Sequence, residues 1–244
     1  MMIDIAANAP IGSNKRPQIL LIHGAFHGSW VWQKVLDRLA PRDWRVHTVD
    51  LPSVAAKGQL RYGLLDDAAE IRRRIEAIDG PVVVVAHSYG GMTITEAAAG
   101  LANVRHIIYI AAFLLDVGES VLGLIEVEPP WWIVDGDTLT AGQPLETFFA
   151  DVAVDDAARA VHRLQPSSYS IVTERLTAAA WRDVPSTYVI CEHDQSISLQ
   201  DQEHMAQRAT NVRRLPSSHS PMLSRPAELA QIIVDAAVKA ASTR

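Results

Sequence analysis

Residues 82–91 read VVVVAHSYGG, and this stretch decides the fold. Consecutive valines without polar alternation are typical of a strand buried on both faces, as in a parallel sheet with helices on each side. A helical pattern over 65–78 ends before it at DGP (79–81), which is a strong stop signal. Another helical pattern follows at 93–99. The sequence thus predicts a helix, a buried strand, a tight turn at Ser88 and a second helix.

Short apolar runs alternate with helical patterns on both sides of this unit. Further strands are predicted at 18–22, 45–49, 106–111, 186–191 and 212–215, and further helices at 29–40, 200–209 and 227–241. Alternation of this kind specifies an α/β fold, with a mostly parallel sheet and helices on both of its faces.

One long segment interrupts the alternation. Residues 115–182 carry helical fragments and several aromatic residues but no clear buried strand, and they separate two strands of the sheet. We interpret this segment as a cap inserted over the carboxyl edge of the sheet, and two ordinary connecting helices with a loop are the alternative. Apart from an N-terminal tail at 1–16, the sequence predicts one domain over 17–244.

The composition excludes several classes of function. The 244 residues include 22 Lys and Arg against 28 Asp and Glu, a formal net charge of −6, which argues against a nucleic-acid partner. A single cysteine, Cys191, excludes an internal disulfide and a cysteine-based zinc site. No signal-peptide pattern and no apolar run approaching 18 residues is present, so we expect a cytoplasmic protein without a membrane partner. Whether it forms a homodimer is left open.

Ser88 has the surroundings of a nucleophile on a tight turn. The pattern G-x-S-x-G has small residues two positions before and after a serine, because the strained backbone brings those positions close together. Here Ala86 replaces the first glycine, and Gly90 is the second. The helix beyond Ser88 directs backbone N–H groups and a partial positive charge at the site. Ser88 is therefore the predicted nucleophile.

An acid follows one later strand and a histidine follows the next. Asp194 comes after the strand at 186–191, and His219 comes after the strand at 212–215. Together with Ser88 they give the chain order serine, acid, histidine. We expect His219 to take the serine proton and later return it to the leaving group, while Asp194 holds the imidazole tautomer.

The early strand at 18–22 ends in the turn HGAF (23–26). A His-Gly turn in this position can supply one backbone N–H to an oxyanion, and the residue after the nucleophile supplies the other. The predicted donors are the backbones of Ala25 and Tyr89. If the turn is shifted by one residue, Phe26 replaces Ala25.

Other polar residues receive different interpretations. Asp116 follows another strand and Glu192 lies two residues before Asp194, so both are alternatives for the acid, although a solvated or cap-associated role suits Asp116 better. His23 and His27 have a spacing that would hold a metal only on a helix. Because they fall in a strand-to-loop segment, no metal site is predicted there.

These segments resemble the α/β-hydrolase superfamily. More narrowly, the sequence is similar to small single-domain esterases related to plant methylesterases and hydroxynitrile lyases, and to bacterial hydrolases of pyrethroid and aryl esters. The resemblance is carried by HGAFHGSWVW (23–32), VDLP (49–52), VVVVAHSYGG (82–91), YVICEHD (188–194) and SSHSPMLSRPAELA (217–230). It implies an α/β-hydrolase fold, no cofactor, and a cap that lines an apolar pocket.

The resemblance implies hydrolysis of a small-molecule carboxylic ester with apolar groups, through an acyl-enzyme on Ser88. Cleavage of a carbamate or an amide by the same triad is an alternative. A lyase is disfavoured, because Gly24 and Ser220 stand where the resembled lyases carry threonine and lysine. A small-molecule receptor on the same fold is a further, non-enzymatic alternative, against which the complete triad argues.

Aromatic residues of the cap and of the early turn are the expected pocket lining. These are Phe26, Trp131, Trp132, Phe148 and Trp181. Packing within the cap itself is the competing explanation for the four that lie in the cap.

Overall fold

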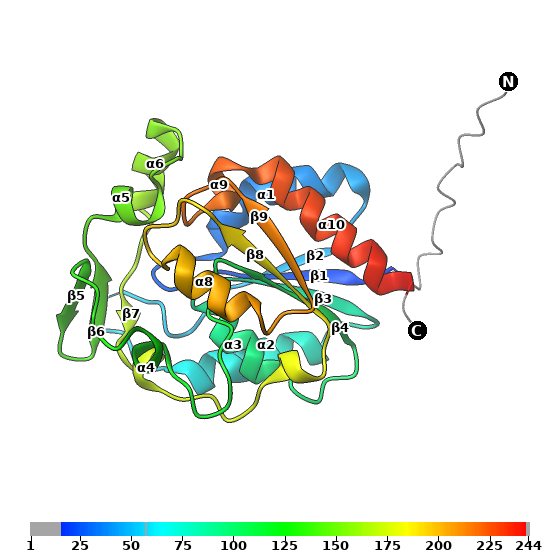
Figure 1. Ribbon diagram of the computed structural model, residues 1–244, viewed down its shortest axis with the longest axis horizontal. Helices are drawn as coiled ribbons and strands as arrows, with labels where there is room; N and C mark the ends of the chain where they lie inside the picture. Colours follow the sequence, from blue (N-terminus) through cyan, green and yellow to red (C-terminus); the bar gives the residue numbers. More distant parts are fainter. Residues whose placement is uncertain (1–15, 57, 243–244) are drawn as a thin grey trace, which may run out of the picture.

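The computed structural model describes residues 16–56 and 58–242 (Figure 1). Except for Arg16, the predicted N-terminal tail at 1–16 lies outside these ranges. Within the described ranges, no helix combines the length and the apolar character needed to cross a membrane.

A six-stranded sheet forms the centre of the molecule, and its strand order is β2-β1-β3-β4-β8-β9. Every neighbouring pair in this sheet is parallel. The strands are β1 (Gln18–Ile22), β2 (Val46–Val49), β3 (Val82–His87), β4 (Val104–Ile110), β8 (Ser186–Cys191) and β9 (Asn211–Leu215). The predicted parallel α/β sheet is therefore confirmed, and each predicted strand overlaps an observed one.

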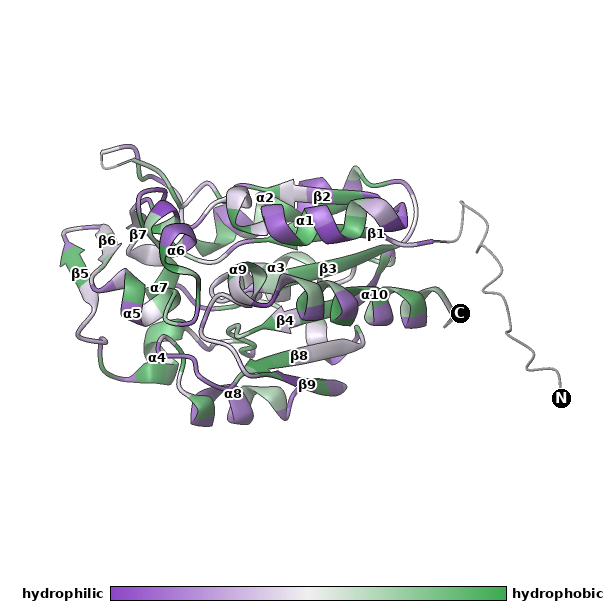
Figure 2. Cartoon of the chain, turned by 90° about the horizontal axis from the view of Figure 1, so that it is seen from above, coloured by the Kyte–Doolittle hydropathy of each residue, from purple (hydrophilic) through white to green (hydrophobic). Residues whose placement is uncertain are grey.

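Helices cover both faces of this sheet (Figures 1 and 2). One face carries α1 (Gln33–Leu39), α10 (Pro226–Ser242) and the short η1 (Ser29–Trp32), η2 (Ala40–Arg42) and α9 (Pro221–Ser224). The other face carries α2 (Leu64–Glu76), α3 (Gly90–Ala97) and α8 (Leu199–Ala206). Figure 2 shows that the strands and the helices differ in hydropathy. The central strands are largely hydrophobic, whereas the helices contain both hydrophobic and hydrophilic residues.

Strand β3 shows why its valines are consecutive. Val82 and Val84 belong to the core cluster that includes α2 and α3, whereas Val83 and Val85 belong to the cluster that includes α1 and α10. All four side chains are fully buried. Because successive side chains of a strand point to opposite faces, a strand between two helical layers needs apolar residues at every position.

The cap segment, residues 115–182, is inserted between β4 and β8 at the carboxyl edge of the sheet (Figure 1). It contains α4 (Val121–Ile125), β5 (Trp132–Asp135), β6 (Thr138–Ala141), α5 (Pro144–Phe148), α6 (Val154–Val161), β7 (Ser167–Ser168), α7 (Ser170–Thr173) and η3 (Ala180–Arg182). The sequence predicts no clear buried strand here, but β5, β6 and β7 form a small antiparallel sheet. These strands are short and β5 is mostly exposed, so they lack the buried apolar run on which the prediction depends.

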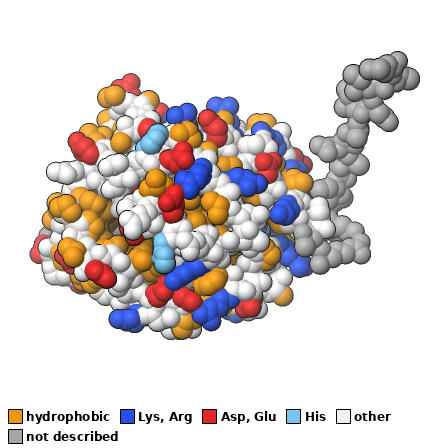
Figure 3. Space-filling model, in the orientation of Figure 1, with side chains coloured by type: hydrophobic (Ala, Val, Ile, Leu, Met, Phe, Trp, Pro, Cys, Tyr) orange, Lys and Arg blue, Asp and Glu red, His pale blue; other side chains and the backbone are white. Residues whose placement is uncertain are grey.

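The surface differs between the two ends of the molecule. Acidic and basic side chains are interspersed over the face in Figure 3, whereas hydrophobic side chains gather at its cap end. The cap segment exposes Val127, Ile133 and Val134. On the face drawn, the described residues form no extended basic patch, in keeping with the acidic composition.

Candidate active site

Ser88 lies at the turn from β3 to α3, and its backbone is left-handed, with φ of 53°. Residues other than glycine rarely adopt this conformation, and strain of this kind concentrates at functional sites. The Ser88 N–H donates to the Ile110 carbonyl at 3.2 Å, and the Ser88 carbonyl accepts from the Phe113 N–H at 3.1 Å. Space is also limited, since a Cβ on Gly90 would lie 2.7 Å from the carbonyl oxygen of His23. The predicted strand–turn–helix unit is present.

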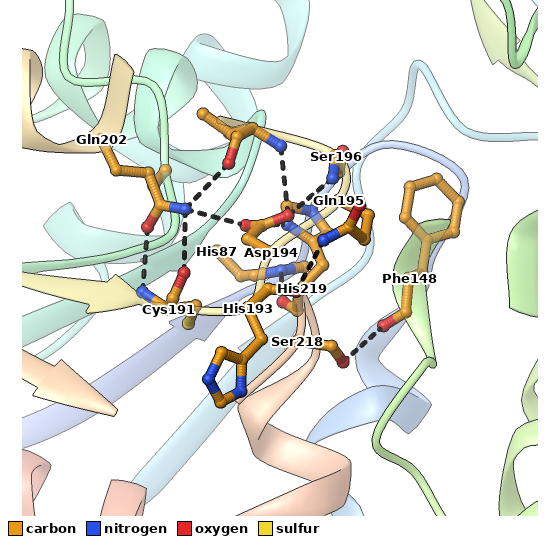
Figure 4. Close-up of polar contacts among 12 residues, drawn as sticks. His87, Phe148, Cys191, His193, Asp194, Gln195, Ser196, Gln202, Ser218 and His219 are labelled. Carbon is orange, nitrogen blue, oxygen red and sulfur yellow. Dashed lines mark hydrogen bonds and ion pairs between the residues drawn. The ribbon is translucent and has the colours of Figure 1, made fainter. Parts of the chain in front are cut away.

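His219 and Asp194 form a buried pair beyond the carboxyl ends of β9 and β8 (Figure 4). The Nδ1 of His219 lies 2.7 Å from Oδ2 of Asp194. Because Nδ1 donates to this carboxylate, Nε2 of the neutral ring is an acceptor. Ser88 and His219 line the same cavity. The three residues predicted as a triad therefore meet at one site.

The two alternative acids are engaged elsewhere. Oδ2 of Asp116 lies 2.7 Å from a guanidinium nitrogen of Arg182, and Oε1 of Glu192 lies 3.6 Å from one of Arg214. Asp194 is thus the acid that reaches the histidine.

Asp194 is held by groups that the sequence analysis missed. Its Oδ1 accepts from the N–H groups of Ser196 at 2.7 Å and Ile197 at 3.1 Å, and its Oδ2 accepts from Nε2 of Gln202 at 3.2 Å. Gln202, on α8, also accepts from the Cys191 N–H at 2.9 Å (Figure 4). The acid is therefore oriented through a fully buried glutamine. No local pattern distinguishes such a residue from a surface glutamine of an amphipathic helix.

The turn after β1 and the turn after β3 contribute the candidate oxyanion donors. Ala25, Phe26 and Tyr89 line the cavity together with Ser88. Phe26 has a left-handed backbone with φ of 66°, and its N–H donates to Oγ of Ser167, on β7, at 2.9 Å. Because the Phe26 N–H is engaged in this way, Ala25 remains the candidate from the first turn. Tyr89 is the candidate from the second.

Three further buried histidines surround the site. The Nδ1 atoms of His23 and His27 donate to carbonyls of their own turn, at 2.8 and 2.7 Å, and Nε2 of His87 donates to the carbonyl of His219 at 2.8 Å. These hydrogen bonds from the histidine rings therefore hold the backbone of the site in place. Over residues 16–56 and 58–242, no three or more His, Cys, Asp or Glu side chains are grouped to hold a metal ion.

The cavity beside Ser88 has a volume of about 40 Å³ and a mostly apolar lining. Four of the five predicted pocket residues line it, namely Phe26, Trp131, Trp132 and Phe148. The Phe148 ring stacks on Phe26 at 5.9 Å between centroids and meets Trp131 edge-on at 5.3 Å. Trp181 is not among the lining residues, contrary to expectation. Its Nε1–H donates to the Leu115 carbonyl at 2.9 Å, so this bond joins the two ends of the cap segment.

The cap segment is fastened to the loop that carries His219. The Oγ of Ser218 donates to the carboxylate of Asp151. It also lies 3.4 Å from the carbonyl oxygen of Phe148 (Figure 4). The rings of Phe148 and His219 are 5.6 Å apart between centroids. Contacts of the cap segment thus reach the residue next to the histidine as well as the histidine itself.

Comparisons with known proteins agree with this geometry. Residues 19–232 match the profile described as the alpha/beta hydrolase family. The chain is 28% identical to the alpha/beta hydrolase nvfD of Aspergillus novofumigatus, over 92% of this chain and 98% of that protein. It is 27% identical to methylesterase 9 of Arabidopsis thaliana, over 90% of this chain and 98% of that protein. A solved pyrethroid hydrolase from Sphingobium faniae has a TM-score of 0.80 and 24% identity, covering 91% of this chain and 97% of the other, and shows the same fold.

The buried histidines make stability sensitive to acid. Burial lowers the pKa of His27 to about 3 and that of His106 to about 4, and it lowers the pKa of His23 and His87 as well. Burial acts in the opposite direction on Asp67 and raises the pKa of its carboxyl to about 6. Unfolding below pH 6 therefore takes up protons on the four histidines and releases one from Asp67.

We expect the free energy of unfolding to fall as the pH is lowered from 6 to 4, with a slope of at most about 4 kcal/mol per pH unit for three protons. Urea unfolding followed by tryptophan fluorescence at several pH values measures this slope. His106→Gln, at a buried position bonded to Thr187 away from the cavity, should reduce the slope by about one proton, or about 1.4 kcal/mol per unit. A free energy of unfolding that stays constant from pH 7 to 4.5 would contradict the expectation.

Proposed function

The chain belongs to the alpha/beta hydrolase family, and on that premise we propose that it is a serine esterase. It cleaves carboxylic esters with apolar acyl or alcohol groups through an acyl-enzyme on Ser88. The observation that carries the proposal is the 2.7 Å contact of His219 with Asp194, at a cavity that Ser88 also lines. The likeness to a protein named methylesterase supports the choice of an ester bond.

The reaction runs in two halves. Nε2 of His219 takes the proton of the Ser88 hydroxyl as the oxygen attacks the ester carbonyl, and the resulting imidazolium is stabilised by Asp194. The N–H groups of Ala25 and Tyr89 stabilise the tetrahedral oxyanion. The imidazolium then protonates the alkoxide, and the alcohol leaves. In the second half, His219 deprotonates a water molecule that attacks the acyl-enzyme. The imidazolium then returns the proton to the Ser88 oxygen as the acyl C–O bond breaks, which releases the carboxylic acid and regenerates Ser88.

The pocket and the turn support ester hydrolysis over the lyase alternative. Aromatic and aliphatic side chains line most of the cavity, and they favour apolar substituents on the ester. A Cβ on Gly24 would lie 2.7 Å from Cβ of Ser88. A threonine, as in the resembled lyases, would therefore collide with the nucleophile in this turn.

Replacing Ser88 by alanine should lower the turnover of short-chain p-nitrophenyl esters by about 10⁶-fold, because the attacking oxygen is lost. Release of p-nitrophenol measures this rate. Ser242→Ala, at the end of α10, serves as the matched control and should keep the activity of the unmodified protein. Turnover by Ser88→Ala near the unmodified rate would overturn the proposal. Folded protein without any ester turnover would favour the receptor alternative instead.

Asp194→Asn should reduce kcat on the order of 10⁴-fold, because an amide does not hold the tautomer of His219 that leaves Nε2 as the base. Asp116→Asn is the control, since it removes a carboxylate that pairs with Arg182. We expect that variant to keep its kcat. The assignment of the acid is wrong if Asp116→Asn is the disabling change and Asp194→Asn is not.

Trp131→Ala should raise kcat/KM for octanoyl over acetyl esters by about tenfold, because removing the indole makes room for one or two additional methylenes at about 0.8 kcal/mol each. Trp181→Ala should leave this ratio unchanged and lower thermal stability only. The p-nitrophenyl ester series, combined with melting curves, distinguishes the two effects. Loss of stability in Trp131→Ala with no change in the ratio would assign this residue to the packing of the cap segment.

A further inference from the structure

Asp67 is a buried carboxylate that the proposed reaction does not use. It lies on α2 with its side chain fully buried, and no Lys or Arg pairs with it among the described residues. Its Oδ1 accepts from the Ser53 N–H at 2.9 Å, and its Oδ2 accepts from the hydroxyls of Ser53 at 2.6 Å and Tyr89 at 2.8 Å. A carboxylate in such a place is costly unless these hydrogen bonds compensate it. A buried carboxylate at this position therefore indicates a specific role.

The contact with Tyr89 leads directly to the oxyanion site. Tyr89 follows the nucleophile, and its backbone N–H is one of the two candidate donors. Its side chain is 2% exposed, with the phenol bonded to Asp67 at the far end. Fixing the phenol restricts rotation of the whole residue, and with it the direction of the N–H.

The contact with Ser53 leads to the other donor. The Ser53 carbonyl accepts from the Ser168 N–H at 2.9 Å. Ser167, the adjacent residue of β7, accepts from the Phe26 N–H through its Oγ at 2.9 Å. Phe26 adjoins Ala25, so this path of hydrogen bonds through β7 connects Asp67 with the first donor. The bond to the Tyr89 phenol connects Asp67 with the second donor.

We propose that Asp67 is a positioning residue of the oxyanion hole, whose carboxylate acts through the phenol of Tyr89 and through Ser53 to fix the two backbone donors. The inference rests on the proposed esterase function. A carboxylate suits the role because it accepts all three hydrogen bonds. An asparagine amide would direct its own donor at one of these N–H or O–H groups.

The test compares Asp67→Asn, Tyr89→Phe and the double variant on p-nitrophenyl butyrate. Complete loss of an oxyanion donor costs about 10²–10³-fold in kcat, so a displaced donor should cost about tenfold or more, with KM within about threefold. Since both single variants break the same contact, the double variant should lose little beyond the larger single loss. Tyr89→Phe keeps the test valid if Asp67→Asn does not fold.

An inhibitor supplies a readout that general destabilisation would not move. A trifluoromethyl ketone adds to the Ser88 oxygen and leaves a negatively charged oxygen in the hole. Its Ki should rise by the same factor by which kcat/KM falls in each variant. Asp66→Asn is the matched control on the same helix, because it removes the charge of a carboxylate that accepts from the Gly63 N–H at 2.9 Å and has no contact with Tyr89, and it should keep kcat and Ki.

The outcomes separate the two proposals. Unchanged kcat and Ki in Asp67→Asn and Tyr89→Phe, with Ser88→Ala inactive, overturn the positioning role and leave the esterase standing. Multiplicative losses in the double variant, or an equal loss in Asp66→Asn, also overturn the role. If the unmodified protein shows no Ser88-dependent turnover, both proposals fail.

Discussion

The left-handed backbone of Ser88 is the constraint on which the rest of the site depends. A residue with a side chain holds this conformation only if its neighbours over-determine it. They do so here through the bonds to Ile110 and Phe113, and through the closeness of Gly90 to the carbonyl of His23. These contacts come from β4 and from the residues that follow β4 and β1, the two strands on either side of β3. The parallel sheet thus fixes the turn. Strands β3, β8 and β9, which precede Ser88, Asp194 and His219, all end at the same carboxyl edge of that sheet.

Local patterns predicted the sheet, the turn and the family, because each depends on a short run of residues. The valines of β3 reveal burial on both faces, and the residues after β3, β8 and β9 reveal the serine, the acid and the histidine. The match over residues 19–232 confirms the resemblance drawn from those runs. Gln202 escaped prediction because its partners lie in other elements, and nothing nearby marks it as buried. The prediction that Trp181 lines the pocket was wrong for a related reason. An aromatic residue in a cap can pack against the pocket, against the cap or against the main sheet, and the sequence does not distinguish these positions.

Two sets of buried polar groups hold the residues of the site by hydrogen bonds. Gln202 and the loop after β8 orient Asp194, and His87 holds the carbonyl of His219. On the other side, Asp67 and Ser167 lie behind the turns that carry Tyr89 and Phe26. These supports are buried, and burying the ionisable ones costs free energy. In acid, His87 lowers stability, whereas Asp67 acts in the opposite direction because burial raises the pKa of its carboxyl. A site of this kind keeps its geometry because the hydrophobic layers on both faces of the sheet outweigh that cost.

The small cavity has a consequence for how affinity should be understood. Ligand pockets commonly measure about 300–1,000 Å³, whereas about 40 Å³ is open beside Ser88. Under the proposed function, a bulky ester would displace aromatic rings on binding, and the carbonyl of Phe148 accepts a hydrogen bond from Ser218 of the histidine loop. Part of the binding free energy of such an ester would then go into deforming the cap segment. The Michaelis constant of a bulky ester then measures the stiffness of that segment as much as its complementarity to the substrate.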